Sequence, residues 1–283
     1  MKIINFISEY NNIGNYTPVW GINKMLENYV IEKVIDARKF KKINIEDYNV
    51  TIVGGAGLFH RCFEEFWKWL STKKIPIILW GIGTCVIHEN TPYFNLIKDK
   101  TSYTNPNIIE KVKKNIVLAN VRDFLTNDFY NLKANISFCP TAIYFEDRKH
   151  TKLGNNILYV DNKELIYDEE RKFILSYCND CTDNFFDEDY NKVIQKYIDA
   201  KIVVTTKLHG AIIANSLGRP YIAYSKDQKI KEFYEVYKGG LYLESLSNLP
   251  EKIKQLNDDS VKININYEKI YLFANKVKSY LNN

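Results

Sequence analysis

Residues 206–210 hold the side-chain types best suited to binding an anion. A buried strand is predicted to run directly into a helix over 208–217 that is rich in small residues. Thr206 is expected to cap this helix and to leave free backbone N–H groups after it, where the helix dipole favours negative charge. Lys207 and His209 add two potential cations in the same first turn, so we expect a phosphate or carboxylate site here. The alternative is an ordinary helix start with a solvated lysine and a hydrogen-bonded histidine.

A glycine-rich turn follows the predicted strand 50–53. Gly54, Gly55 and Gly57 allow a ligand to approach the backbone closely. The turn is not a G-x-G-x-x-G motif, because His60 occupies the place of the last glycine, and no Gly-Lys-Ser/Thr follows. Nucleotide binding through either motif is therefore disfavoured. His60 is a candidate residue of the cleft wall, with a purely structural role as the simpler explanation.

Two further cations follow predicted strands. Arg122 comes after the strand 116–119, and Lys229 comes after the strand 221–223. An arginine at the carboxyl end of a strand can make a bidentate contact with an anion. From spacing alone, a surface pair of Arg122 with Asp123 is the simpler explanation, and Lys229 by itself is a weak signal.

Short apolar runs alternate with longer amphipathic segments along the chain. Strands are predicted at 2–7, 50–53, 75–80, 116–119, 156–160, 172–176, 202–204 and 221–223. Helices are predicted at 18–30, 61–70, 123–130, 187–198, 208–217 and 267–281. This alternation is typical of an α/β protein whose parallel sheets carry helices on both faces. In such sheets ligands bind beyond the carboxyl ends of the strands, where the candidate residues lie.

The polar, turn-prone stretch 146–156 is predicted to be a linker. It divides the chain into an N-terminal domain, residues 1–150, and a C-terminal domain, residues 151–283. We expect two Rossmann-like domains whose parallel sheets face a common cleft. The second domain would carry the anion site at 206–210 and the terminal helix 267–281.

Composition narrows the class of protein. The chain has 283 residues, of which 46% are hydrophobic and 26% are charged, as in globular proteins. A net charge of +5 without a lysine or arginine stripe argues against nucleic acid as a partner. No apolar run reaches the length of a membrane span. Five cysteines, an odd number, disfavour a disulfide framework and indicate a reducing compartment, so we expect a cytoplasmic protein.

Short motifs follow one another at the predicted strand ends. They are Gly14-Asn15, Gly54-Gly55-Ala56-Gly57, Gly81-Ile82-Gly83, Val121-Arg122-Asp123, Cys139-Pro140 and Thr206-Lys207-Leu208-His209-Gly210, with Lys229 downstream. In this order they resemble the polysaccharide pyruvyl transferase family, and the resemblance spans most of the chain.

The resemblance implies a two-domain fold like that of B-type glycosyltransferases, with the acceptor side on the N-terminal domain and the donor-anion site on the C-terminal domain. It also implies that phosphoenolpyruvate donates a pyruvyl group to two hydroxyls of a sugar in a cell-surface glycan, which forms a ketal and releases phosphate. His209, as general acid, and Arg122 would be catalytic. The donor would be bound by Thr206, Lys207, Leu208, Lys229, Gly54 and Gly55, and the acceptor by Asn15 and His60. Phosphoenolpyruvate is a co-substrate in this scheme, and neither a metal nor a cofactor is implied.

Three positions depart from the family pattern. Lys207 stands where the family has arginine, Tyr16 where it has an acidic residue, and Thr141 where it has aspartate. These departures keep two alternatives open. One is a glycosyltransferase that uses a nucleotide sugar in surface polysaccharide biosynthesis, and the other is a catalytically silent relative that acts as a binding subunit.

The acceptor is expected to be a free or a lipid-linked saccharide. The terminal helix region is basic, with Lys262, Lys269, Lys276 and Lys278. A peripheral contact with the inner face of the membrane is one interpretation of these lysines, and a solvated helix face is the simpler one.

Overall fold

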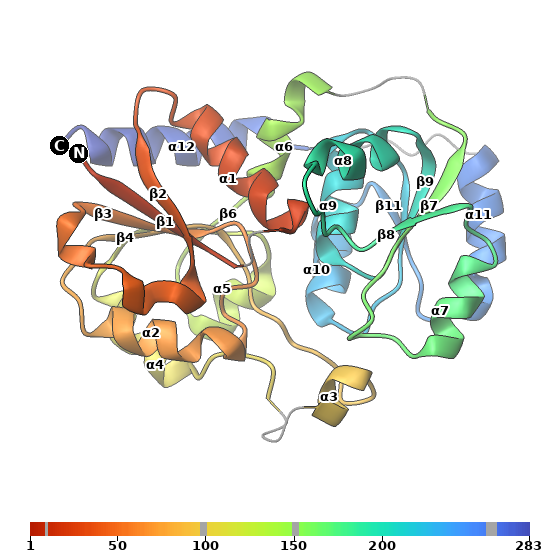
Figure 1. The fold of residues 1–283 in the computed structure, drawn as a ribbon, viewed down its shortest axis with the longest axis horizontal. Helices are drawn as coiled ribbons and strands as arrows, with labels where there is room; N and C mark the ends of the chain where they lie inside the picture. The colour runs from red at the N-terminus through yellow and green to blue at the C-terminus, as the bar shows by residue number, and fades with distance from the viewer. Residues whose placement is uncertain (9–10, 97–100, 149–152, 259–264) are drawn as a thin grey trace.

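Two parallel sheets form the two halves of the molecule (Figure 1). The computed structural model describes residues 1–8, 11–96, 101–148, 153–258 and 265–283. The first sheet has the strand order β2 (Ile31–Asp36), β1 (Ile3–Ile7), β3 (Val50–Gly54), β4 (Ile77–Ile82), β5 (Ile116–Val121) and β6 (Asn135–Ile136). The second has the order β11 (Gly240–Tyr242), β10 (Tyr221–Ala223), β9 (Ala200–Thr205), β7 (Asn156–Val160) and β8 (Asp180–Thr182). The expected α/β class with two parallel sheets is confirmed.

Helices cover both faces of the first sheet. They are α1 (Ile13–Met25), α2 (Glu64–Ser71), α4 (Pro106–Lys113), α5 (Phe124–Tyr130) and α12 (Tyr267–Leu281). Successive residues of a strand point to opposite faces. Accordingly, Ile78 and Trp80 of β4 pack in one core with α1 and α12, whereas Ile77 and Leu79 pack in another with α2 and α4.

The second half repeats this arrangement with α7 (Asp168–Leu175), α8 (Tyr190–Ile198), α9 (Leu208–Ser216), α10 (Gln228–Tyr237) and α11 (Leu249–Asp258). Helix α9 is apolar on all sides and almost wholly buried. Its Gly210 lies so close to Thr205 and Val160 that a Cβ atom there would overlap the Thr205 side chain. The helix is therefore seated directly against the sheet, which fixes the position of its first turn.

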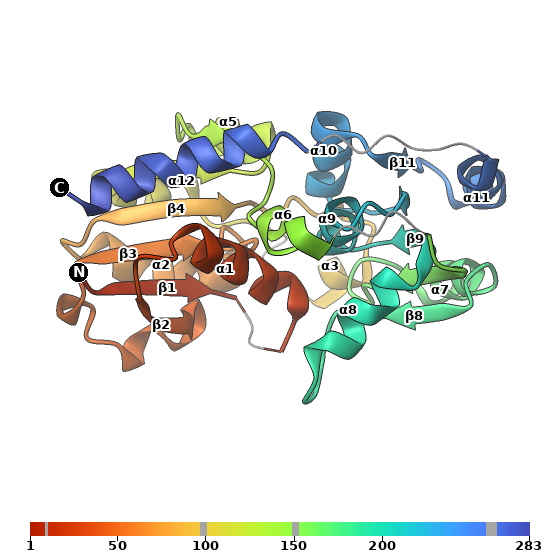
Figure 2. The same ribbon diagram turned by 90° about the horizontal axis from the view of Figure 1, so that it is seen from above.

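Helix α12 returns from the second half and packs on the sheet of the first (Figure 2). The rings of Phe273 and Trp80 meet edge to face with centroids 5.3 Å apart. Lys276 Nζ donates to Asn135 Oδ1 at 3.0 Å, and the hydroxyl of Tyr29 donates to the carbonyl of Lys278 at 3.3 Å. We expected this helix in the second domain, and that assignment is wrong. Periodicity identifies the apolar face of a helix but not the sheet that covers it.

The boundary expected at residue 150 falls between the last strand of the first sheet and the first strand of the second. Residues 149–152 of the expected linker, and Lys262 of the basic region, lie outside the described residues. The chain reaches the boundary through the short helix α6 (Thr141–Tyr144), which packs on α1. The hydroxyls of Thr17 and Thr141 lie 3.1 Å apart at this contact.

Two expected elements are wrong. The helix expected over 18–30 begins earlier, because the side chain of Asn12 accepts from the backbone N–H of Gly14 at 2.9 Å and caps α1 there. Pro18, a common first helical residue, lies inside α1 instead. The strand expected over 172–176 is the end of α7. Three acidic residues in its first turn favour the helix over the short apolar run that resembled a strand.

We predict that Phe273→Ala destabilises the protein by about 3–5 kcal/mol, the usual cost of removing a buried aromatic ring. Phe273 is almost fully buried against Trp80, although it comes from the far end of the chain. Phe173→Ala is the matched control, because Phe173 is 37% exposed and should change the unfolding free energy far less. Urea unfolding measures both, and equal losses in the two variants would contradict the placement of α12.

Candidate active site

A cavity of about 690 Å³ lies between the two halves, where the carboxyl ends of their strands meet. Residues just beyond β1, β3, β4 and β5 form one wall, and residues just beyond β7, β8, β9 and β10 form the other. Among the lining residues are Asn15, His60, Cys85, Arg122, Asp161, Thr206, Lys207, Leu208, His209 and Lys229. The cavity therefore brings together most of the residues that the sequence analysis singled out.

Arg122 is the most deeply buried cation of the wall, with 1% of its surface exposed. Its guanidinium lies against Gly83, where a Cβ atom would overlap it. Its Nη1 lies 3.4 Å from Nε2 of His209, and its Nε has no hydrogen-bond partner among the residues that the structure describes. No carboxylate in the described part of the chain forms an ion pair with it. A cation held in this way is an open binding group for an anion.

Asp123, the expected surface partner of Arg122, is buried and is the N-cap residue of α5. Its Oδ1 accepts from the backbone N–H of Thr126 at 2.6 Å and caps α5. Burial raises the pKa of this carboxyl group, although Arg122 and Thr126 oppose the shift. The surface pair suggested by the spacing is therefore not formed.

His209 lies in the first turn of α9 and faces Gly14 of α1. A Cβ atom at Gly14 would come within 2.6–2.8 Å of the His209 side chain, so only glycine leaves room for the ring. Burial lowers the pKa of His209 well below its ordinary value, and Arg122, Lys229 and Lys207 lower it further. The imidazole is thus neutral at neutral pH. An anion bound beside the ring would raise this pKa, because an opposite charge favours the protonated form.

Lys229 reaches the cavity from the start of α10. Its Nζ lies 2.6 Å from Oδ2 of Asp227 and 2.9 Å from Sγ of Cys85. Burial opposes the charge on Lys229, but the negative charge of Asp227 and the contact with Cys85 outweigh it and raise the pKa. Lys229 is therefore a fixed positive charge, linked to the first half through Cys85.

Thr206 and Lys207 line the cavity, but Thr206 does not cap the helix as expected. Its hydroxyl accepts from the backbone N–H of Asn162 at 2.8 Å and lies 3.2 Å from the carbonyl of Val160, so it ties β9 to the loop after β7. Lys207 is itself the N-cap residue of α9. Its Nζ donates to the carbonyl of Asp183 at 2.6 Å and lies 5.0 Å from the ring centroid of Phe185.

Gly54 and Gly55, the glycines expected to bind the donor, are not among the residues that line the cavity. A Cβ atom at Gly54 would overlap the carbonyl of Trp80, and one at Gly55 would come 2.7 Å from Cβ of Pro18. Gly55 also has a φ of +82°, which favours glycine. Gly54 therefore serves the packing of β3 against β4. Gly55 packs on Pro18 of α1, and its backbone forms a hydrogen bond with His209, whereas Gly57 lines the cavity.

Asn15 and His60, the expected acceptor residues, both line the cavity. His60 is held by its neighbours, since Nε2 lies 2.8 Å from the Tyr93 hydroxyl and Nδ1 accepts from the backbone N–H of Cys62 at 3.2 Å. Burial, helped by Lys229, lowers the pKa of His60 to about 4. His60 is thus a neutral residue of the wall that its neighbours hold in place.

Asp161 and Cys85 are wall residues that the sequence analysis missed. Asp161 follows β7 directly, and its Oδ2 accepts from Nε of Arg171 at 2.6 Å. The rule that polar residues after buried strands line the cleft would have found it. Cys85 gives no such signal, because a lone cysteine after a strand is most often a buried apolar side chain.

The charges of the cavity favour an anion. The carboxylates of Asp161 and Asp227 are each paired with a cation, whereas Arg122 has no such partner in the chain as described. Within the described residues, no three His, Cys, Asp or Glu side chains gather in a way that would hold a metal ion. In the same part of the chain, no helix has the length and apolar character needed to cross a membrane.

Comparisons with known proteins agree with this fold. Residues 2–228 match the family model described as polysaccharide pyruvyl transferase. No curated protein matches the chain.

Similar solved structures include a protein from Klebsiella pneumoniae described as uncharacterized, at 14% identity, with 86% of this chain and 93% of that chain covered and a TM-score of 0.55. The UDP-GlcNAc 2-epimerase of Methanocaldococcus jannaschii covers 100% of this chain and 99% of its own at 11% identity, with a TM-score of 0.61. The enzyme of that name from Neisseria meningitidis covers 100% of both chains at 9% identity, with a TM-score of 0.56. At these identities the likeness shows the fold alone, and it confirms the expected two-domain architecture.

We predict that the free energy of unfolding falls as the pH is lowered from about 6.5 to about 4. In that window the unfolded chain binds a proton at His60 that the folded protein, with a pKa of about 4 there, does not. The shift corresponds to a loss of up to about 3 kcal/mol, and His209 acts in the same direction. Urea unfolding across this range tests it, and an equally steep decline in His60→Gln would contradict the role of His60.

Proposed function

The chain belongs to the polysaccharide pyruvyl transferase family, and we propose that its cavity catalyses transfer of a pyruvyl group from phosphoenolpyruvate to a sugar of a cell-surface glycan. The matched region, residues 2–228, contains both sheets except the edge strand β11 and ends at the start of α10. Two hydroxyls of the sugar form a ketal with the pyruvyl carbon, and inorganic phosphate is released.

One observation carries the proposal. The buried guanidinium of Arg122 lies beside an imidazole and has no carboxylate partner among the described residues. Holding such a cation out of water costs several kcal/mol unless an anion balances it. Phosphoenolpyruvate carries a phosphate and a carboxylate on three carbons, so it supplies two anionic groups to a cavity that also contains Lys229 and Lys207.

Each cation suits a different part of the donor. Arg122 offers a planar fork that matches two oxygens of a phosphate or carboxylate, whereas Lys229 is a point charge. The first N–H groups of α9, at Leu208 and His209, have no partner within the helix and add donors where the dipole is positive. The two anionic groups are thus held by one group from the first half and by several from the second.

His209 is the proton carrier of the proposed reaction. A proton passes from its ring to the methylene carbon of phosphoenolpyruvate, which becomes a methyl group and leaves positive charge on the neighbouring carbon. A sugar hydroxyl attacks that carbon and returns its proton to the ring. Phosphate then leaves with the C–O bonding electrons, and the second hydroxyl closes the ketal as its proton passes to the departing phosphate. The sugar loses two protons, of which one replaces the proton that His209 gave to carbon and the other leaves on the phosphate. His209 therefore ends the reaction in the protonation state in which it began.

Binding of the donor would itself favour the protonated form of His209, which the reaction needs. Burial, together with three nearby cations, lowers the pKa of His209 and keeps its ring neutral. A bound dianion offsets those charges and raises the pKa of the ring, because an opposite charge nearby favours the charged form. The acid is therefore prepared only when the donor is present.

Polar groups of the second half are available to the acceptor. Asn162 and Glu164 after β7 and Asn184 after β8 line the cavity across from Asn15. Amides and carboxylates are the usual partners of sugar hydroxyls, since they can both donate and accept or accept twice. The acceptor is proposed to enter on this side, with its reacting hydroxyls toward His209.

We predict that His209→Gln lowers the rate of phosphate release from phosphoenolpyruvate by about 100-fold or more, the usual contribution of a positioned acid. The assay uses a panel of glycans as acceptors and measures inorganic phosphate. His88→Gln is the matched control, because His88 is exposed, lies outside the cavity wall and should release phosphate at the normal rate. An unchanged rate in His209→Gln would remove His209 from the mechanism.

The change in melting temperature on adding a ligand distinguishes the proposed function from the two alternatives. Phosphoenolpyruvate should raise the melting temperature by mass action, and Arg122→Gln should abolish this shift. A shift with nucleotide sugars alone would favour a glycosyltransferase. The absence of a shift with either ligand would favour a catalytically silent relative.

We also predict that binding of phosphoenolpyruvate takes up a proton, so that its affinity decreases as the pH rises through neutrality. The reason is that His209 is neutral in the empty cavity and charged beside the donor. Calorimetry in buffers of different ionisation enthalpy measures the uptake, which should disappear in His209→Gln. Proton release on binding, or equal uptake in the variant, would contradict this step.

A further inference from the structure

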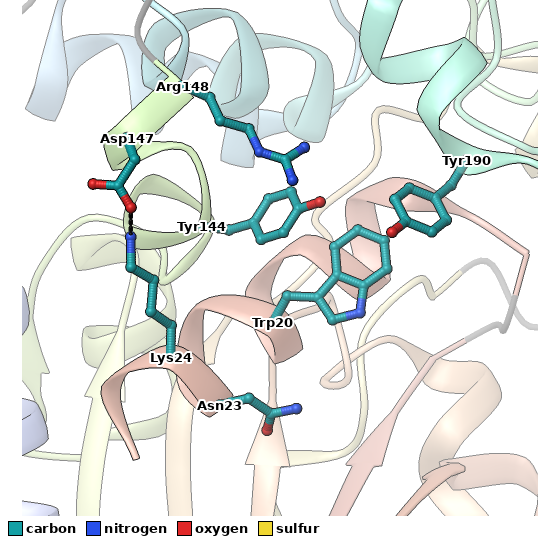
Figure 3. A pocket seen from close by; sticks show the side chains of 7 residues that line it. All are labelled: Trp20, Asn23, Lys24, Tyr144, Asp147, Arg148 and Tyr190. Atoms are coloured by element: carbon teal, nitrogen blue, oxygen red, sulfur yellow. Dashed lines mark hydrogen bonds and ion pairs between the residues drawn. The ribbon is translucent and has the colours of Figure 1, made fainter. Parts of the chain in front are cut away.

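A second hollow, the aromatic pocket, lies between α1, α6 and α8, outside the cavity (Figure 3). It has a volume of about 450 Å³ and is lined by Trp20, Asn23, Lys24, Tyr144, Asp147, Arg148 and Tyr190. None of these residues lines the cavity that holds His209. The pocket therefore needs an explanation of its own.

Three half-buried rings from three elements form the floor of this pocket. The centroid of Trp20 lies 4.8 Å from that of Tyr144 and 4.6 Å from that of Tyr190, and the planes are tilted by 43° and 47°. Figure 3 shows the indole of Trp20 between the two tyrosine rings. Aromatic rings buried in a core normally have both faces covered, whereas each of these retains exposed surface. Exposed ring surface of this kind can contact the weakly positive C–H groups of a ligand.

Polar and charged groups surround the rings. The guanidinium of Arg148 lies 4.7 Å from the centroid of the Tyr144 ring. Lys24 forms an ion pair with Asp147, and its Nζ also donates to the carbonyl of Ile143 at 3.3 Å. The side chain of Asn23 is exposed at the edge. Flat apolar faces bordered by several donors and acceptors match a sugar ring, which has C–H faces and hydroxyl edges.

Aromatic contacts connect the pocket to the cavity. Tyr16 stacks on Trp20 with centroids 5.5 Å apart and meets Phe186 at 5.7 Å, and Phe186 meets Tyr190 at 6.0 Å. The sequence neighbours of Tyr16 and Phe186, Asn15 and Phe185, line the cavity. At about 1.5 Å per helical residue, Trp20 lies only about 8 Å along α1 from Asn15, which a short oligosaccharide spans.

We propose that the aromatic pocket is a carbohydrate subsite that binds a sugar residue of the acceptor chain other than the one being modified. The inference rests on the proposed function, because it places an acceptor sugar in the cavity and extends its chain along Tyr16 and Phe186. The rings supply stacking, and Arg148 and Asn23 supply hydrogen bonds to hydroxyls. Affinity for the acceptor is thereby gained at a distance from the reacting centre.

Fluorine NMR of protein labelled with 5-fluorotryptophan tests the subsite directly. The chain has four tryptophans, and Trp20→Phe identifies the Trp20 signal by its loss. Cellotetraose, chitotetraose and maltotetraose serve as probes. We expect at least one of them to shift the Trp20 signal and to leave that of Trp69 in place. Trp69 is the matched control, since it is also half-buried but packs against Phe6 and Phe40, outside both hollows.

The variant Tyr190→Ala should weaken the binding of that tetrasaccharide by about tenfold, as expected for the loss of one stacking ring. Trp69→Phe should leave the binding unchanged. The proposal is overturned if no tetrasaccharide moves the Trp20 signal, or if Tyr190→Ala binds the tetrasaccharide as tightly as the unmodified protein.

The thermal shift with phosphoenolpyruvate distinguishes failure of the subsite proposal from failure of the proposed function. That shift should be the same in Tyr190→Ala as in the unmodified protein, because the ring lies outside the donor cavity. A normal shift with no tetrasaccharide bound would reject the subsite alone. Tetrasaccharide binding without any shift would reject the donor proposal and retain the carbohydrate site.

Discussion

A guanidinium held out of water beside an imidazole is the interaction on which the site depends. Arg122 has no carboxylate partner among the described residues, and its neighbour His209 is kept neutral by burial and by the surrounding cations. Gly83 and Gly14 are the positions that make this possible, because any side chain at either one would overlap the arginine or the histidine. Among the described residues this buried positive charge has no counter-charge beside it, which costs free energy unless an anion balances it.

The site exists only where the two halves meet. Arg122 comes from the first sheet, whereas His209 and Lys229 come from the second. Several contacts fix this junction: the Tyr237 hydroxyl donates to the carbonyl of Arg122 at 2.7 Å, and Lys229 contacts Cys85 of the first half. Because these contacts use the same residues that face the cavity, small rotations of one half against the other would change the spacing of the charges.

The positions of the strand ends could be predicted from the sequence, but the contacts that individual side chains make there could not. Arg122 and His209 follow buried apolar runs, and the geometry of parallel sheets brings such positions together. Gly54 packs closely against the carbonyl of Trp80, and the sequence does not separate this role from ligand binding, because glycine serves both. Thr206 was expected to cap a helix, yet its hydroxyl found partners on a neighbouring segment, which local sequence does not reveal. The placement of α12 in the second domain is wrong for the same reason, since the sheet that this helix packs on is formed by residues distant in the sequence.

The return of α12 to the first sheet has a consequence for synthesis. Ribosomes synthesise the chain from its N-terminus, so N-terminal segments ordinarily fold before C-terminal segments are made. Here Trp80 receives its partner Phe273 only after the whole second half has been translated. One side of the nascent first sheet thus stays partly uncovered for most of translation, and the later-made half can complete its own core before the earlier one does.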